Sequence, residues 1–154
     1  HSSYDLFSYE NSEIQEVHKK VKEIITWLYT KNNKSFFESH KLAMNSWANI
    51  NSDHTYQSFH NHAEWALSAV FYVSVPEVDA NSKNGALTFQ DFSSRSVNPN
   101  YRDLTHLFGE RQRSLKVNTS DLVIFPSYLP HAVTPTYLKE PRITIAFNFL
   151  AIKI

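Results

Sequence analysis

The stretch SFHNHAEWALSAVFYVSVP (residues 58–76) decides the fold class, because a polar, histidine-rich end leads directly into an apolar run. His60, His62 and Glu64 occupy every second position of the polar end. Residues with this spacing share one face of a β-strand, about 6.5–7 Å apart at each step of two, so a pair of them can hold one metal ion. The same spacing is equally typical of a polar strand end with surface histidines, and this stretch alone leaves both interpretations open.

The apolar run, residues 66–75, alternates with the period of two that is typical of a β-strand. Ser68, Val70 and Tyr72 fall on one face, and the intervening apolar side chains fall on the other. We expect the second face to enter the core. Tyr72 could bring a hydroxyl group to a ligand carboxylate, although a buried tyrosine more often contributes packing alone.

Outside this stretch, the sequence predicts one helix followed by a series of short strands. Residues 12–31 repeat apolar side chains at helical spacing, and Ser12 with Gln15 can form a capping box. Segments rich in Val, Ile, Phe, Tyr and Thr, bounded by Asn, Ser, Asp and Pro, then indicate strands. One supporting helix and many short strands predict a mainly β fold, a sandwich or a barrel. We expect the strands at residues 42–51, 57–62, 66–75, 86–90, 122–126, 131–137 and 142–152.

The composition limits what the chain can be. With 154 residues, of which 42% are hydrophobic, residues 1–154 are expected to form a single domain with its own core. The 15 basic and 15 acidic residues cancel, which argues against a nucleic acid or an anionic membrane as partner. No segment approaches about 20 consecutive apolar residues, so we expect no membrane span. Because the chain has no cysteine, any metal must be held by His, Asp or Glu, and we expect a cytoplasmic protein.

A long polar segment, residues 91–116, shows no clean period. A loop of this length in a compact domain is typically a lid, a binding loop or a disordered insertion. Its arginines could favour an anionic substrate, although a solvated surface loop is the simpler explanation. They are Arg95, Arg102, Arg111 and Arg113.

A second candidate for function is His131. A buried strand at residues 122–126 ends in a Pro-Ser turn, which delivers His131 to the start of another extended run. A lone histidine in this position is usually structural. Pro130 and Pro135 on either side fix the local backbone, which favours a defined role for the ring between them.

A third candidate is Arg142, which begins the C-terminal strand. Arg142 and Thr144 share one face with a methyl and an amide, whereas bulky apolar residues form the other face. An arginine on a buried strand needs an anionic partner, because an unpaired buried charge is very costly. That partner is either an acidic side chain of the protein or a ligand carboxylate held by two parallel hydrogen bonds.

Together, these residues describe a facial metal site with open positions, suited to a bidentate ligand and O₂ on Fe(II). With that site in view, the sequence resembles the small 2-oxoglutarate- and Fe(II)-dependent oxygenases of bacteria and phages, a branch of the double-stranded β-helix superfamily. The matching pieces stand in the family's order and cover roughly two-thirds of the chain. They are NSWANIN (45–51), HNHAEWALSAVFYVSVP (60–76), DLVIFPSYLPHAVTP (121–135) and RITIAFN (142–148).

The resemblance implies a double-stranded β-helix core, of the jelly-roll or cupin-like type, over residues 42–152. It implies Fe(II) as cofactor, with 2-oxoglutarate and O₂ as cosubstrates. His131 then corresponds to the distal iron ligand, Arg142 to the residue that pairs with the far carboxylate of 2-oxoglutarate, and Tyr72 to a neighbour of that carboxylate. Further candidates for cosubstrate binding on the same strand faces are Ser68 and Thr144.

The choice of proximal metal ligands stays open at this stage. The superfamily usually offers His-x-Asp or His-x-Glu, whereas this chain offers both His-Asn-His and His-Ala-Glu. His60 and His62 give three imidazoles with His131, while His62 and Glu64 restore two imidazoles and one carboxylate. In this fold the proximal ligands close a strand before a loop crosses to the next one. His60 and His62 leave residues 63–66 for that loop and are therefore preferred, with Glu64 as the alternative to His60.

For function, the resemblance implies oxidative decarboxylation of 2-oxoglutarate to succinate and CO₂, coupled to hydroxylation of a substrate. A cupin-like metal dioxygenase that does not use 2-oxoglutarate is a second hypothesis, because three-imidazole sites occur in such enzymes, but it would not need Arg142. A jelly-roll binding module without metal is a third. The sequence leaves the substrate and the oligomeric state open.

Overall fold

The computed structural model describes residues 5–77, 83–90 and 112–154. Two short 3-10 helices, η1 (Leu6–Ser8) and η2 (Phe36–Glu38), flank the helix α1 (Ser12–Thr30). None of the described helices has the length and hydropathy that crossing a membrane requires. The described strands are β1 (His40–Asn51), β2 (Gln57–His60), β3 (Leu67–Ser74), β4 (Leu87–Gln90), β5 (Gln112–Leu115), β6 (Leu122–Pro126), β7 (His131–Val133) and β8 (Arg142–Lys153).

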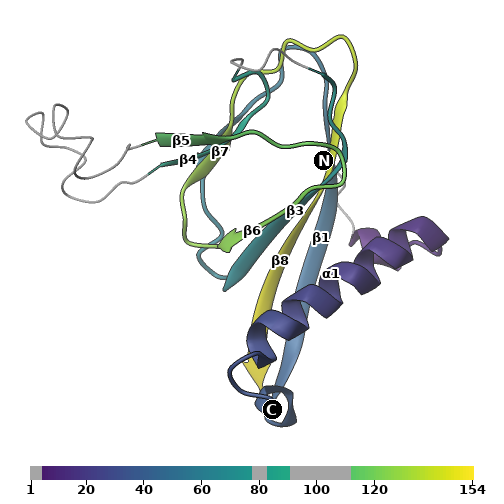
Figure 1. Cartoon of the computed structure of the whole chain (residues 1–154), viewed down its shortest axis with the longest axis vertical. Helices are drawn as coiled ribbons and strands as arrows, with labels where there is room; N and C mark the ends of the chain where they lie inside the picture. Colours follow the sequence, from purple (N-terminus) through teal and green to yellow (C-terminus); the bar gives the residue numbers. More distant parts are fainter. Residues whose placement is uncertain (1–4, 78–82, 91–111) are drawn as a thin grey trace, which may run out of the picture.

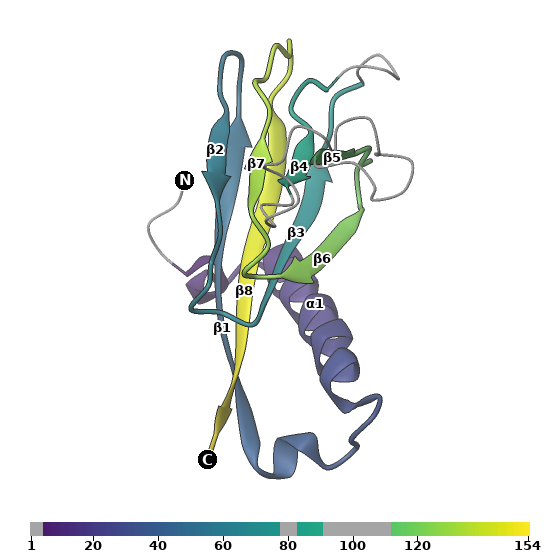
Figure 2. The same cartoon turned by 90° about the vertical axis from the view of Figure 1, so that its left-hand side faces the viewer.

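The strands form two antiparallel sheets that face each other (Figures 1 and 2). The major sheet has the strand order β1-β8-β3-β6, and the minor sheet has the order β2-β7-β4-β5. The chain passes back and forth between the two sheets, which is the winding of a double-stranded β-helix. The predicted fold class, mainly β with one supporting N-terminal helix, is therefore confirmed.

The helix α1 lies across the outer face of the major sheet and buttresses it, as its amphipathic pattern predicts (Figure 2). Its buried residues, Val21 and Ile25, belong to one core cluster with Ile145, Phe147 and Phe149. Burial of apolar side chains of this size stabilises the fold by about 1.5–3 kcal/mol each. Because side chains alternate along β8, the residues between these core positions point to the opposite face, into the space between the two sheets.

The N-terminus of α1 differs from the prediction. Asn11, not Ser12, is the N-cap: its backbone is extended, and its side chain accepts a hydrogen bond from the Ile14 N–H at 2.9 Å. Ser12 is already helical and donates to Glu13, while the Gln15 amide donates to backbone carbonyls outside the helix. The predicted capping box is therefore wrong, because the preceding asparagine satisfies the free N–H group one residue earlier.

Two strand predictions also need correction. Part of the segment predicted as a long loop, residues 91–116, forms the strand β5, and residues 91–111 lie outside the described part of the chain. The β5 sequence QRSL has no apolar alternation, and it is a strand because it pairs with β4 from Leu87 opposite Leu115 onward. The predicted strand 131–137 ends at Val133, since Pro135 has no N–H to continue the ladder.

Candidate metal and cosubstrate site

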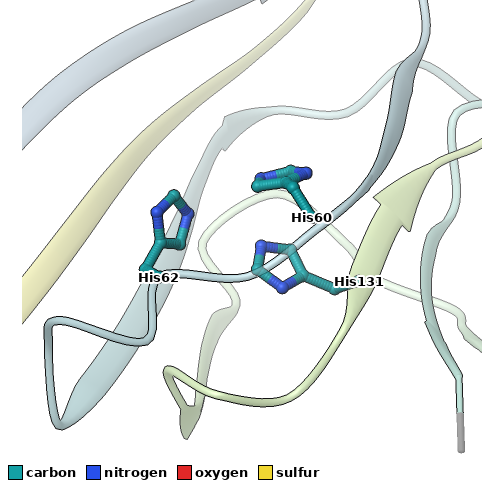
Figure 3. A group of neighbouring side chains, drawn as sticks. All are labelled: His60, His62 and His131. Atoms are coloured by element: carbon teal, nitrogen blue, oxygen red, sulfur yellow. The ribbon is translucent and has the colours of Figure 1, made fainter. Parts of the chain in front are cut away.

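Three histidines, one on each of the neighbouring strands β2 and β7 and one just beyond the end of β2, converge on one point between the sheets (Figure 3). His60 ends β2 and pairs in register with His131, the first residue of β7, while His62 follows two residues beyond the end of β2. One ligand nitrogen from each ring lies within 4.8 Å of the other two. The ring centres of His60 and His131 are 4.4 Å apart. Three imidazoles at this spacing could donate to a single metal ion.

Backbone hydrogen bonds orient two of the three rings. The Nδ1 atom of His60 lies 2.8 Å from the Ser58 carbonyl, and that of His131 lies 2.9 Å from the Leu129 carbonyl. Because a carbonyl can only accept, each Nδ1 must carry the hydrogen and each Nε2 keeps its lone pair. This is the tautomer and the supporting hydrogen bond that metal-binding histidines usually show.

Burial favours the neutral form of two of the imidazoles, those of His131 and His62. It is the main cause that lowers the pKa of His131 to about 4; the hydrogen bond to Leu129 opposes the shift, and His60 and His62 add to it. Burial also lowers the pKa of His62, with a further lowering from His60 and an opposing effect of Glu64. Neutral imidazoles have free lone pairs, so these groups can bind a metal at neutral pH without first losing a proton.

Glu64 is not part of the converging group. The strand β2 ends at His60, so the alternation that would have placed Glu64 on the same face stops before it. The chain instead turns, with the Trp65 N–H donating to the His62 carbonyl at 2.9 Å, and the Glu64 side chain is exposed. Among the described residues, the group that could hold a metal consists of histidines alone. The structure thus assembles the His60 and His62 pair and not the alternative with Glu64.

The histidines line a cavity of about 220 Å³ between the two sheets. Leu87, Val133 and Phe125 contribute apolar walls, and Asn49 and Gln57 contribute amides. Among the described residues that line the cavity, the histidines and an arginine are the ionisable ones, and neither a carboxylate nor a lysine is present. A cavity with this lining carries a net positive charge, which favours an anionic ligand.

The arginine of the cavity is Arg142, which is 3% exposed. It donates from its NH1 atom to the Asn51 side-chain oxygen at 3.3 Å, and its guanidinium lies 5.1 Å from the centre of the Tyr72 ring. Its Nε atom is buried without a hydrogen-bond partner, and no carboxylate of the described residues forms an ion pair with it. Of the two partners that the sequence allows for Arg142, an acidic side chain is therefore not found in the described part of the chain.

Tyr72 is fully buried beside Arg142, and within the described part of the chain its hydroxyl has no partner at regular hydrogen-bond geometry. Burial raises the pKa of Tyr72, and the positive charge of Arg142 opposes the shift, so the phenol is neutral and able to donate. Two adjacent buried donors without partners are unusual, because an unsatisfied buried polar group costs about 1–3 kcal/mol. Of the two residues, Arg142 lines the cavity, whereas Tyr72 is not among the lining residues.

The two remaining candidates occupy different positions. Thr144 is buried and lines the cavity two residues beyond Arg142 on the same face of β8. Ser68 also lines the cavity, but its hydroxyl already has hydrogen-bond partners within the protein. It donates to the Asn148 side chain at 2.7 Å and lies 2.8 Å from the Ser127 hydroxyl. Ser68 is thus less available to a ligand than Thr144.

Sequence reasoning missed two residues of this site, Asn51 and Ser127. Asn51 is the last residue of β1 and contacts Arg142 across the sheet, but nothing in the sequence pairs these positions. Ser127 is fully buried, and its carbonyl accepts the His62 N–H at 2.9 Å. Both contacts join segments far apart in the chain, so no local pattern could have revealed them.

Comparison with known proteins agrees with this geometry. Residues 45–148 match the model of a family described as "Putative 2OG-Fe(II) oxygenase", where 2OG stands for 2-oxoglutarate. No curated protein matches the sequence of this chain.

Solved structures share the fold. An oxidoreductase of the 2OG-Fe(II) oxygenase family from Burkholderia pseudomallei superposes with a TM-score of 0.53 at 11% identity, over 83% of this chain and 57% of that protein. A prolyl-4-hydroxylase from Pseudomonas putida gives 0.52 at 16% identity, over 77% and 56%. HygX from Streptomyces hygroscopicus, with nickel and 2-oxoglutarate bound, gives 0.50 at 13% identity, over 70% and 57%. The chain therefore spans a little over half the length of these proteins, and at such identities the likeness concerns the fold alone.

The family model, unlike the structural likeness, rests on the sequence itself. It spans well over half of the chain and includes the three converging histidines and Arg142. This chain therefore belongs to the family of 2OG-Fe(II) oxygenases.

Proposed function

We propose that this chain is a 2-oxoglutarate-dependent dioxygenase that hydroxylates an organic substrate and releases succinate and CO₂. The observation that carries the proposal is the presence, in one cavity, of three converging imidazoles and a buried arginine without a carboxylate partner among the described residues. The imidazoles suit the metal, and the arginine suits the free end of a dicarboxylate. HygX, which shares the fold, was solved with nickel and 2-oxoglutarate bound, in line with this choice of ligands.

In this proposal each residue has a defined part. His60, His62 and His131 bind Fe(II), with the Nε2 atoms of His60 and His131 presented by their backbone hydrogen bonds. Arg142 binds the far carboxylate of 2-oxoglutarate, and the Tyr72 hydroxyl donates a further hydrogen bond to it.

The bound Fe(II) and 2-oxoglutarate would supply O₂ activation, in which one oxygen atom enters succinate and the other enters the hydroxylated product. Four electrons reduce O₂ in this reaction, two from the decarboxylation and two from the substrate C–H bond. The protein positions the groups and keeps water away from them: the apolar side chains of Leu87, Phe125 and Val133 form the walls of the cavity.

A cupin-like dioxygenase without 2-oxoglutarate is the second candidate, favoured by the all-histidine set, which lacks the carboxylate of the usual facial triad. Arg142 argues against it. A buried guanidinium with a free Nε is costly to maintain, and an enzyme that binds no dicarboxylate has no use for it.

The test is an anaerobic titration of the Fe(II)-loaded protein with 2-oxoglutarate, followed by the visible charge-transfer band of the bidentate chelate. The variant Arg142→Ala is titrated beside it. Arg113→Ala serves as the matched control, since Arg113 is an exposed arginine of β5 outside the lining of the cavity.

We expect a band in the parent and in Arg113→Ala, and an affinity for 2-oxoglutarate at least about 100-fold weaker in Arg142→Ala, because a lost charge-assisted bidentate contact is worth several kcal/mol. Bound iron without a band in the parent would favour the cupin-like enzyme instead. Failure to bind iron at all would favour the third hypothesis, a jelly-roll binding module without metal.

A further inference from the structure

We infer that Asn51 determines the selectivity of the cavity for a dicarboxylate: its neutral amide holds Arg142 in position without neutralising its charge. The inference rests on the proposed function, because it assigns a role toward the cosubstrate to a residue outside the group of converging histidines. Asn51 acts here as a positioning residue, through Arg142.

The first observation is the contact itself. Asn51 ends β1 and stands directly opposite Arg142, the first residue of β8, in the antiparallel ladder. The Arg142 NH1 atom donates to the Asn51 side-chain oxygen at 3.3 Å, and the two residues are 3% and 7% exposed. A buried arginine is normally paired with a carboxylate of the protein. An amide satisfies one N–H group and leaves the full positive charge for a ligand.

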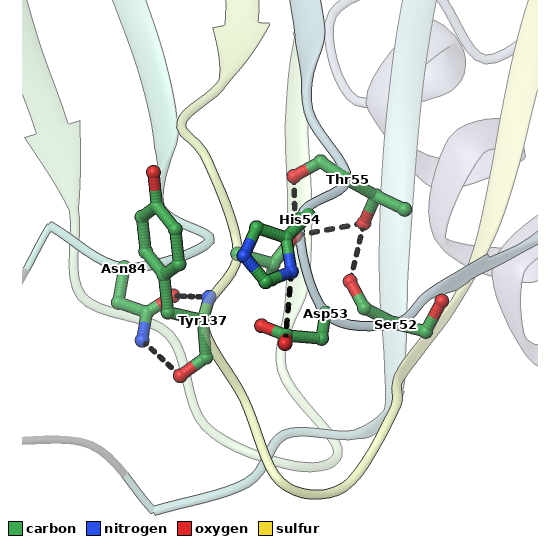
Figure 4. Close-up of polar contacts among 7 residues, drawn as sticks. Ser52, Asp53, His54, Thr55, Asn84 and Tyr137 are labelled. Carbon is green, nitrogen blue, oxygen red and sulfur yellow. Dashed lines mark hydrogen bonds and ion pairs between the residues drawn. The ribbon is translucent and has the colours of Figure 1, made fainter.

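The second observation fixes which way the amide points. The Thr55 hydroxyl lies 2.7 Å from the Ser52 carbonyl (Figure 4) and 2.7 Å from the Thr136 hydroxyl, so its single hydrogen goes to one of these two oxygens. Its oxygen can therefore only accept from the Asn51 amide nitrogen, which lies 3.5 Å away. The amide nitrogen thus faces Thr55, and the amide oxygen faces Arg142.

The third observation is the rigid frame around this pair. Thr55 and Thr136 hold the β1–β2 turn against the segment before β8: their hydroxyls lie 2.7 Å apart, and the Thr136 N–H donates to the Thr55 carbonyl at 2.8 Å. Next to them, the Asn84 side chain both accepts from the Tyr137 N–H, at 2.7 Å, and donates to its carbonyl, at 3.0 Å (Figure 4).

Gly85 completes this frame. Its φ is +62°, and a Cβ atom there would lie 3.0 Å from the Thr136 Cγ2 atom and 3.8 Å from the Arg142 Cδ atom. Gly85 thus lies beside the aliphatic part of Arg142, while Asn51 binds its NH1 atom, and the two contacts limit the positions open to the guanidinium. Such preorganisation reduces the entropy lost on binding.

The consequence concerns charge. A carboxylate at position 51 would neutralise Arg142 and repel the far carboxylate of 2-oxoglutarate, whereas the ligand's keto-acid end, at the metal, would be unaffected. Pyruvate has the keto-acid end without the second carboxylate, so it reports on the metal end alone. The ratio of the two affinities therefore measures the selectivity that we assign to Asn51.

The experiment compares 2-oxoglutarate with pyruvate by anaerobic titration of the Fe(II)-loaded parent and of Asn51→Asp, Asn51→Ala and Asn49→Asp. Asn49 lines the same cavity two residues away on the same face of β1, but pairs with Thr144 and not Arg142, so Asn49→Asp adds the same charge without the contact. Thermal unfolding and Fe(II) affinity of each variant show whether it is folded with an intact metal end.

We expect Asn51→Asp to weaken binding of 2-oxoglutarate by about 100-fold, since a misplaced like charge costs several kcal/mol, and to leave pyruvate unchanged. Asn51→Ala should weaken 2-oxoglutarate by about tenfold through the loss of one hydrogen bond to a charged group, and Asn49→Asp by less than either. The metal-free protein gives a second readout: glutarate, which lacks the keto group, should raise the melting temperature of the parent but not of Asn51→Asp.

Two results would overturn the inference alone: affinity of Asn51→Asp for 2-oxoglutarate within threefold of the parent, or an equal loss for 2-oxoglutarate and pyruvate. In either case Arg142→Ala would still bind 2-oxoglutarate at least about 100-fold more weakly than the parent, and the proposed function would stand. A parent that binds iron but no 2-oxoglutarate would overturn both.

Discussion

The hydroxyl groups of Ser68 and Ser127 lie 2.8 Å apart at the centre of a fully buried network that joins the segments carrying His62 and His131. The Ser68 hydroxyl also donates to the side chain of Asn148 in β8, at 2.7 Å. The backbone of Ser127 holds the other segment, because its carbonyl accepts the His62 N–H and its N–H donates to the Ala66 carbonyl. His131 follows four residues later, at the start of β7. The position of one candidate ligand segment relative to the other thus depends on Ser127.

Removal of the Ser127 hydroxyl should therefore weaken metal binding. We expect Ser127→Ala to lower Fe(II) affinity by about tenfold, the usual effect of losing a contact that orients metal ligands. Substitution of Co(II) for Fe(II) gives a visible spectrum that reports ligand geometry, and this spectrum should change in the variant. Ser46→Ala is the matched control, since Ser46 is a buried β1 serine whose hydroxyl binds Asp5 away from the cavity. Equal effects of the two variants on Fe(II) affinity would show that the Ser127 hydroxyl contributes only to the general stability of the fold.

Single substitutions can show which residues bind the metal. We expect His60→Ala, His62→Ala and His131→Ala each to reduce Fe(II) affinity by about 100-fold or more, because each removes one of three donors. Glu64→Ala should leave the affinity within about twofold, since its exposed carboxylate lies outside the converging group. Anaerobic metal titration provides the measurement. Loss of Fe(II) binding in Glu64→Ala, with binding retained in His60→Ala, would show that the metal ligands are the two imidazoles of His62 and His131 and the carboxylate of Glu64.

The free energy of unfolding of the metal-free protein should fall as the pH drops below about 6.5, because of His131. In the unfolded chain this imidazole binds a proton near its ordinary pKa, whereas in the folded protein it does so only near pH 4. The unfolded state therefore binds more protons in this window. The stabilisation is present above pH about 6.5 and is lost as the pH falls through the folded pKa, by up to about 3 kcal/mol.

Urea denaturation at several pH values tests this expectation. The variant His131→Asn lacks the titrating group and should lose less stability than the parent over the same pH range. If the free energy of unfolding fell with pH equally in the parent and in His131→Asn, groups other than His131 would account for the pH dependence.

Gly85 should resist substitution. Its positive φ is unfavourable for any residue with a Cβ atom, and an alanine there would crowd the Thr136 Cγ2 atom at 3.0 Å. We expect Gly85→Ala to lower the free energy of unfolding by about 1–3 kcal/mol. Thr136→Ser removes the crowded methyl but keeps the hydroxyl, so the double variant should recover the steric part of the loss. A double variant as unstable as the sum of the two singles would assign the whole effect to the backbone.

The sequence by itself determined the parts of this protein that follow from local periodicity. Alternation along β8 separated the core face with Ile145 and Phe147 from the cavity face with Arg142, and the structure agrees. The helical period of residues 12–31 predicted the buttressing helix, which ends one residue earlier at Thr30. These patterns are reliable because each requires only that neighbouring residues share one face of one element. The order of the motifs also sufficed to indicate the oxygenase family.

Only the tertiary structure decided what depends on contacts between distant segments. The strand β5 exists because β4 offers it a partner, although its sequence carries no strand pattern. His60 joins the converging group because β2 ends there and pairs with β7, whereas the turn after His62 removes Glu64 from the same face. Asn51 and Ser127 acquire their roles across the sheets, from Arg142 and Ser68. A single sequence contains the residues of such contacts but not their pairing, because the pairing arises only when the two sheets close around the cavity.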